Sequence, residues 1–113
     1  MLRLAYASLW HWTQRTDCTD SNLSIGYWQL SRIHALLGNA DNARKSADLC
    51  LEKTPSDTPF LFGYAHEALA RAESLAGQDA QAKAHLATAW RHAKNVTDAD
   101  DRQTLVNDLN TFE

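Results

Sequence analysis

The chain has 113 residues and a mass of 12.7 kDa, which is the size of one domain. Alanine and leucine supply 33 residues and valine and isoleucine only 4, which argues against a sheet-based core because strands favour β-branched residues. The net charge of −3 argues against nucleic acid as a partner, and no apolar run approaches the roughly 20 residues that span a membrane.

Turn-forming residues divide the sequence into six predicted helices. Gly38 and Gly77 are expected to end two of them in the left-handed conformation, and Pro55 prevents another from continuing. Thr58 followed by Pro59 predicts a helix start, because proline suits the first helical position, where no backbone donor is needed. The predicted helices cover residues 2–15, 23–37, 40–53, 59–76 and 79–94, followed by a last one capped by Thr97, with a loop over 16–22.

The last predicted helix has a capping box, in which Asp100 follows Thr97 by three residues. Its apolar residues recur at the helical period and predict that one side of this helix lies on a core. These residues are Leu105, Val106, Leu109 and Phe112.

An internal repeat with an offset of 39 residues relates two parts of the chain. Residues 30–43 read LSRIHALLGNADNA, and residues 69–82 read LARAESLAGQDAQA. Leucine, arginine, glycine and alanine recur at matched positions. In both copies a predicted helix meets a glycine turn, and a second helix with an early alanine follows. Small residues at these positions allow the paired helices to approach closely.

These features resemble the tetratricopeptide repeat, as it occurs in small bacterial helical-repeat proteins. The matching positions are Leu30-Ser31 and Leu69-Ala70, Gly38 and Gly77, Ala43 and Ala82, and Cys50 and Ala89. The chain departs from the family pattern at His34 and Glu73, where an aromatic residue is expected, and at Lys94, where a proline is expected. Its period also exceeds the family's length of about 34 residues.

The resemblance implies a single all-α domain over 1–113, in which antiparallel helix pairs stack as a short solenoid of about six helices. It divides the chain into an N-terminal helix over 2–17, repeats over 22–55 and 58–95, and a C-terminal capping helix over 97–113. The alternative is an irregular helical bundle.

The first predicted helix has an apolar face that fills an arc of about 160° at 100° per residue. One neighbouring helix covers a narrower stripe, so part of this face is expected to drive self-association. We expect a two-fold dimer that packs Tyr6, Leu9 and Trp10 against the second copy. The alternative is a monomer in which this helix folds back onto its own chain.

The two cysteines, Cys18 and Cys50, are too few for a secreted disulfide framework, so we expect reduced thiols in the cytoplasm. Cys50 lies among apolar positions and is interpreted as a core residue rather than a reactive thiol. The N-terminal apolar stretch stops at His11 and carries one basic residue, so a signal peptide is not expected.

No set of residues in the sequence indicates a reaction. The histidines lack the i, i+4 spacing of a zinc-binding helix, and His34 and His66 fall where the resembled family has packing aromatics. No glycine elbow surrounds a serine, and no glycine-rich phosphate loop is present. We therefore expect neither enzymatic activity nor a metal or other cofactor. The five histidines are His11, His34, His66, His85 and His92.

In the resembled family, the inner face of the solenoid comes from fixed positions of the first helix of each repeat. Carried over to this chain, these positions are Ile25, Trp28, Arg32 and Ala35, and Tyr64, Glu67, Arg71 and Ser74. Aromatic rings beside guanidinium groups suit an extended peptide or a carboxylate terminus. The candidate groove residues are accordingly Trp28, Arg32, Tyr64, Glu67 and Arg71. The family's carboxylate clamp is not implied, because the lysine and asparagine it needs are missing.

We expect Arg32 and Arg71 to face one open concavity, and Arg71→Glu to weaken the binding of an acidic partner without unfolding the chain. The alternative is that Trp28 packs between helices and that the arginines only solubilise the surface. The expected function is a non-catalytic module that binds a peptide or protein in a concave groove. The alternative function is a small-molecule-binding or hydrolytic helical protein that uses the histidines, which a deep pocket with converging histidines would favour.

Overall fold

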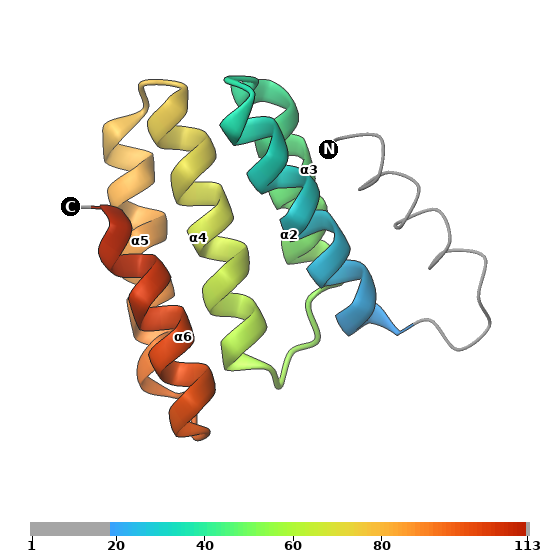
Figure 1. The fold of residues 1–113 in the computed structure, drawn as a ribbon, viewed down its shortest axis with the longest axis vertical. Helices are drawn as coiled ribbons and strands as arrows, with labels where there is room; N and C mark the ends of the chain where they lie inside the picture. The colour runs from blue at the N-terminus through green and yellow to red at the C-terminus, as the bar shows by residue number, and fades with distance from the viewer. Residues whose placement is uncertain (1–18, 113) are drawn as a thin grey trace.

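The computed structural model describes residues 19–112, and all regular structure in this range is helical (Figure 1). This confirms the all-α expectation for the described residues. The predicted first helix, over 2–17, lies outside them. The described elements are α2 (Asp20–Leu36), α3 (Ala40–Lys53), α4 (Pro59–Leu75), α5 (Asp79–Lys94), α6 (Ala99–Leu109) and the 3₁₀ helix η1 (Asn110–Phe112).

Two helix starts differ from the sequence predictions. The helix α2 begins inside the predicted loop, because the Thr19 hydroxyl accepts a hydrogen bond from the Asn22 backbone N–H at 3.2 Å. The N-cap of α6 is Asp98 rather than Thr97, since the Asp98 carboxylate accepts from the Asp101 N–H at 2.9 Å. A carboxylate one residue nearer the helix competes successfully with the threonine hydroxyl as the acceptor for the first turn.

The two glycine turns have the predicted left-handed conformation, with φ of 77° at Gly38 and 79° at Gly77. In the first turn the Asn39 N–H donates to the carbonyl of His34 at 2.9 Å, and the second turn repeats this bond from Gln78 to Glu73 at 2.8 Å. These bonds satisfy carbonyl groups that the end of a helix would otherwise leave unpaired. The turns therefore reverse the chain, so that α2 pairs with α3 and α4 pairs with α5 as antiparallel neighbours (Figure 1).

Alanine makes the close packing of these helices possible. The backbones approach where side chains are small, and the Ser31 hydroxyl donates to the carbonyl of Ala43 across the α2–α3 pair at 2.8 Å. The expectation that small residues lie between paired helices is thereby confirmed. Completely buried alanines occur in α3, α4 and α5, at Ala43, Ala47, Ala65, Ala70, Ala72 and Ala89.

The helix α4 is central, because it contacts each of the other four described α-helices. At Gly63 of α4, a Cβ atom would overlap the side chain of Leu105 from α6. Leu105 and Leu109 are buried as predicted and join a core cluster with Ala89, Ala93 and Val96. The last helix thus lies on α4 and α5, and brings the residues of η1 to the face of α4. No helix among the described residues is long and apolar enough to cross a membrane.

Candidate functional site

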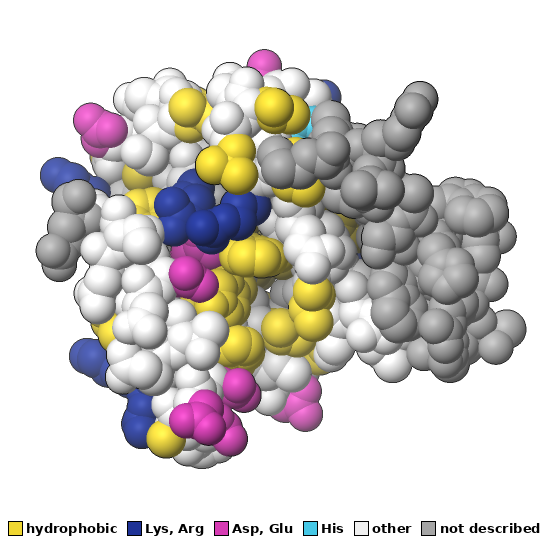
Figure 2. All heavy atoms as spheres, viewed as in Figure 1, with side chains coloured by type: hydrophobic (Ala, Val, Ile, Leu, Met, Phe, Trp, Pro, Cys, Tyr) yellow, Lys and Arg dark blue, Asp and Glu magenta, His cyan; other side chains and the backbone are white. Residues whose placement is uncertain are grey.

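One face of the molecule carries a groove between α2 and α4, with η1 at one end. Figure 2 shows this face, where basic side chains gather above a strip of apolar side chains. The basic end is an open cavity of about 550 Å³, which we call the basic cavity. Its lining residues are Arg32, Ala35 and Leu36 of α2, Arg71, Ser74 and Leu75 of α4, and Thr111 and Phe112 of η1.

A second cavity, of about 250 Å³, lies on the same two helices nearer their N-termini, and we call it the apolar cavity. Aromatic edges form much of its wall, since the Tyr64 ring is edge-on to Trp28 at 5.2 Å and to Phe60 at 5.1 Å. The lining residues are Ser24, Ile25, Trp28, Cys50, Phe60, Leu61 and Tyr64.

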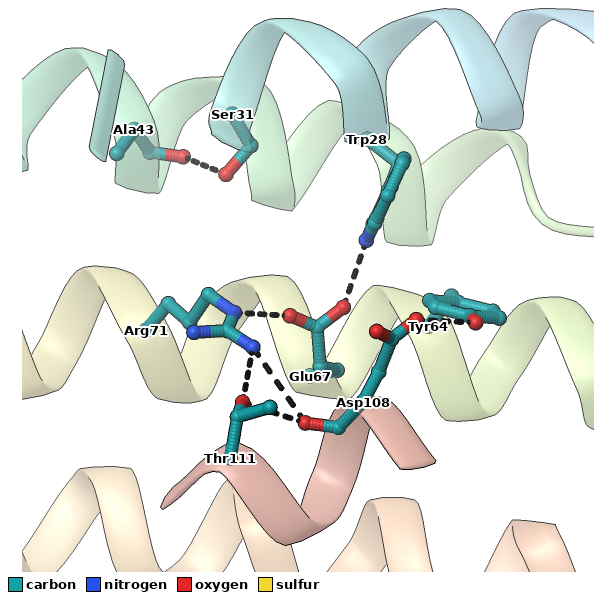
Figure 3. A network of polar contacts seen from close by, with 8 residues as sticks. All are labelled: Trp28, Ser31, Ala43, Tyr64, Glu67, Arg71, Asp108 and Thr111. Carbon is teal, nitrogen blue, oxygen red and sulfur yellow. Dashed lines mark hydrogen bonds and ion pairs between the residues drawn. The ribbon is translucent and has the colours of Figure 1, made fainter. Parts of the chain in front are cut away.

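A buried carboxylate lies between the two cavities. Glu67 of α4 is 0% exposed, and one of its oxygens accepts a hydrogen bond from the Trp28 indole N–H at 2.8 Å (Figure 3). Its other oxygen forms an ion pair with the Arg71 guanidinium. A buried charge is stable only when it is paired and hydrogen-bonded, and Glu67 meets both conditions.

Arg71 makes several contacts within the chain. Besides its pair with Glu67, it donates to the Thr111 hydroxyl at 2.6 Å and lies over the Phe112 ring, with 4.6 Å from the guanidinium carbon to the ring centroid. Its charge is thus balanced by Glu67, and it ties η1 to α4. Arg71→Glu would place a second carboxylate beside Glu67, so it would not separate binding from folding as the sequence led us to expect.

Arg32, the matched arginine of α2, differs in its surroundings. It lies over the Trp28 ring, with 5.5 Å from the guanidinium carbon to the ring centroid. The ion pairs within residues 19–112 join Arg44 to Glu73 and Arg71 to Glu67, so no described carboxylate balances the charge of Arg32. Of the two arginines in the basic cavity, Arg32 is the one that forms no ion pair with a carboxylate of residues 19–112.

The phenol of Tyr64 donates to the Asp108 carboxylate of α6 at 2.5 Å. Burial, followed by the neighbouring Asp108 carboxylate, raises the pKa of Tyr64 above its ordinary value. Tyr64 therefore stays neutral and fastens α6 to α4 while its ring lines the apolar cavity.

The five predicted groove residues come together on one face, but they divide into three roles. Arg32 and Arg71 line the basic cavity, and Trp28 and Tyr64 line the apolar cavity. Glu67 differs from the expectation of an exposed groove residue, because it is buried and holds Trp28 and Arg71. Trp28 fits both sequence interpretations, since it packs between α2 and α4 and also lines a cavity.

Several residues that line the basic cavity were not predicted from the sequence. Leu36 and Leu75 are 69% and 44% exposed, and their signals were an apolar residue shortly before each turn glycine and their matched positions at the 39-residue offset. Thr111 and Phe112 reach the basic cavity because α6 packs onto α4, and no local pattern indicates that long-range contact.

Three histidines converge away from these cavities, on α4 and α5. The Nδ1 atoms of His66 and His85 are 3.2 Å apart, and the ring of His92 lies parallel to that of His66 at 5.8 Å between centroids. Burial, followed by the charges of His85, His92 and Arg91, lowers the pKa of His66 to about 4. Across residues 19–112, no three or more potential ligands are grouped so that they could hold a metal ion.

The remaining candidate residues separate into one that is buried and several beyond the described range. Cys50 is buried as predicted, and burial raises the pKa of its thiol to about 11, so it remains protonated. Tyr6, Leu9 and Trp10, the predicted self-association residues, lie outside residues 19–112, as do Cys18 and His11.

Comparison with protein-family models, with curated proteins and with solved structures gave no match in any of the three.

Proposed function

We propose that this protein is a non-catalytic interaction module that binds a segment of a protein or peptide in the groove between α2 and α4. The observation that carries the proposal is the charge of Arg32, which pairs with no carboxylate of residues 19–112, in an open cavity that Leu36 and Leu75 also line. An acidic group of a partner would supply the missing counter-charge, and the two exposed leucines offer apolar contact beside it. This combination suits a peptide segment better than a purely ionic ligand.

The proposed architecture is a short tetratricopeptide-like solenoid. It is supported by two helix hairpins that turn at Gly38 and Gly77 with the same hydrogen bonds, and by direct contact between α2 and α4. In this interpretation α2 and α4 are the first helices of successive repeats, and α6 is the capping helix that solenoids need. The matched placement of Arg32 and Arg71 in one cavity follows from this arrangement.

The alternative function, a hydrolytic or small-molecule-binding protein that uses histidines, has less support. His66 and His85 contact each other, and neither the basic cavity nor the apolar cavity is lined by a histidine. The proposed compartment is the cytoplasm, where a thiol such as Cys50 stays reduced.

Selection from a random peptide library displayed on phage tests the proposed function. The full chain, Arg32→Glu and Arg102→Glu would be immobilised, where Arg102 is an exposed arginine of α6 outside both cavities. We expect peptides with an acidic residue to be enriched on the first and third proteins and lost on Arg32→Glu. Failure to enrich any peptide, or enrichment that ignores Arg32, would overturn the proposal.

A further inference from the structure

The polar side chains that line the apolar cavity are already engaged within the chain. The Ser24 hydroxyl bonds to the Thr54 hydroxyl at 2.9 Å and lies 3.5 Å from the Cys50 sulfur. The indole N–H of Trp28 and the hydroxyl of Tyr64 are likewise occupied, by Glu67 and by Asp108 of α6. A polar ligand group in this cavity would lose its water and find every polar side chain of the lining already engaged, so the cavity favours an apolar group.

The size of the cavity fits one bulky side chain. Its volume of about 250 Å³ exceeds the ~150 Å³ of a cavity that holds benzene, and falls below the ~300 Å³ at which sites for drug-sized ligands begin. Tyr64 lies edge-on to both Trp28 and Phe60, so these walls are formed before a ligand arrives. Because these side chains are already held in place, binding costs less conformational entropy.

Trp28 connects the apolar cavity to the charge of Arg32, because it lines the cavity and carries the Arg32 guanidinium over its ring. Along α2, Arg32 follows Trp28 by about 6 Å and Ile25 by about 10 Å, at 1.5 Å per residue. An extended chain advances about 3.3 Å per residue, so two or three residues cover this range.

We infer that the partner is an extended peptide segment with an aromatic or branched apolar residue two or three positions from an acidic residue. The apolar side chain occupies the apolar cavity, and the carboxylate pairs with Arg32. The inference rests on the proposed function and specifies its ligand. One segment can present both groups, because Trp28 lines the apolar cavity and also contacts Arg32.

Binding of capped, fluorescein-labelled hexapeptides, measured by fluorescence anisotropy, tests this inference. The peptides contain phenylalanine and aspartate two or three positions apart, in either order. In matched peptides, alanine replaces the phenylalanine or asparagine replaces the aspartate. The test variant is Ile25→Trp, which enlarges a side chain at the cavity's rim that is 44% exposed and so leaves the core contacts in place. Leu49→Trp is the matched control, since Leu49 is 38% exposed on α3 and lines neither cavity.

We expect loss of the phenylalanine to weaken binding to the natural chain at least about tenfold, the scale of burying one large apolar side chain. Ile25→Trp should abolish this preference, and Leu49→Trp should keep it. If Arg32→Glu impairs binding but Ile25→Trp does not, the inference is wrong and the proposed function stands. If neither Arg32→Glu nor Ile25→Trp changes peptide binding, the inference and the proposed function are both wrong. If Ile25→Trp instead lowers the sedimentation mass of the free protein, the cavity belongs to a second copy, which also overturns the inference.

Discussion

Arg71→Met should destabilise the fold, because it removes the cation from a carboxylate that water cannot reach. Glu67 would keep one partner, the Trp28 indole N–H at 2.8 Å, and its negative charge would be uncompensated. Breaking a buried ion pair by removing one partner costs about 3–5 kcal/mol. The Arg71 side chain is 25% exposed, which places the loss near the lower end of that range. The lost contact with Phe112 adds about 0.5–1 kcal/mol.

The expected total, about 3–4 kcal/mol, is a large part of the ~5–15 kcal/mol that holds a domain folded. Urea unfolding followed by circular dichroism measures it. The double variant Arg71→Met with Glu67→Gln should recover at least half of the loss, because glutamine removes the charge and its amide oxygen still accepts from Trp28. This recovery distinguishes an uncompensated charge from a simple loss of packing.

Arg44→Met is the control for this prediction. Arg44 also pairs with a glutamate, Glu73, at 2.5 Å, but its side chain is 38% exposed. The Glu73 side chain is 10% exposed, against 1% for that of Glu67, so this pair is only partly buried and its loss should cost less than the ~3–5 kcal/mol of a fully buried pair. If Arg71→Met is no more destabilising than Arg44→Met, the reasoning about the buried carboxylate is refuted.

Four further results are expected. Gly38→Ala should lower the free energy of unfolding by about 1 kcal/mol through its positive φ alone, since a Cβ there meets no other atom, and urea titration should show this. Leu105→Ala should cost about 2–4 kcal/mol by opening a cavity against Gly63, whereas a loss below 1 kcal/mol would contradict the packing of α6. Stability should fall as the pH falls from about 6.5 to about 4, because the unfolded chain takes up a proton that folded His66 resists; His66→Asn should flatten this slope in urea titrations across that range. Sedimentation equilibrium at micromolar concentration should give about twice 12.7 kDa if the proposed dimer forms, and a mass near 12.7 kDa excludes it.

Local chemistry made most helix boundaries predictable. Gly38 and Gly77 end helices because only glycine adopts a positive φ without strain, and Pro59 starts α4 because it needs no backbone partner there. Such features depend on neighbouring residues, so one sequence reveals them. The start of α6 was misplaced by one residue because Thr97 and Asp98 are both good N-caps, and local propensity does not choose between them.

The face between α2 and α4 was predicted by carrying over the inner-face positions of the resembled repeat family, which follow the helical period, but the role of each residue was not predictable. Glu67 and Trp28 lie 39 positions apart, and only their contact shows that Glu67 is buried. The difference between Arg32 and Arg71 likewise depends on which arginine meets a carboxylate in three dimensions. Charge balance in a folded chain is a property of tertiary contacts, and repeat symmetry therefore overstated how similar the two arginines are.

The most direct test of the binding groove is a nuclear magnetic resonance titration that follows the tryptophan indole N–H signals. Trp28 lies in the groove, whereas Trp90 packs against the core cluster beneath α6. The Trp28 signal, assigned with Trp28→Phe, should move when a library-selected acidic peptide is added, and the Trp90 signal should stay in place. Movement of the Trp90 signal with a stationary Trp28 signal would place the ligand elsewhere and contradict binding in the groove between α2 and α4.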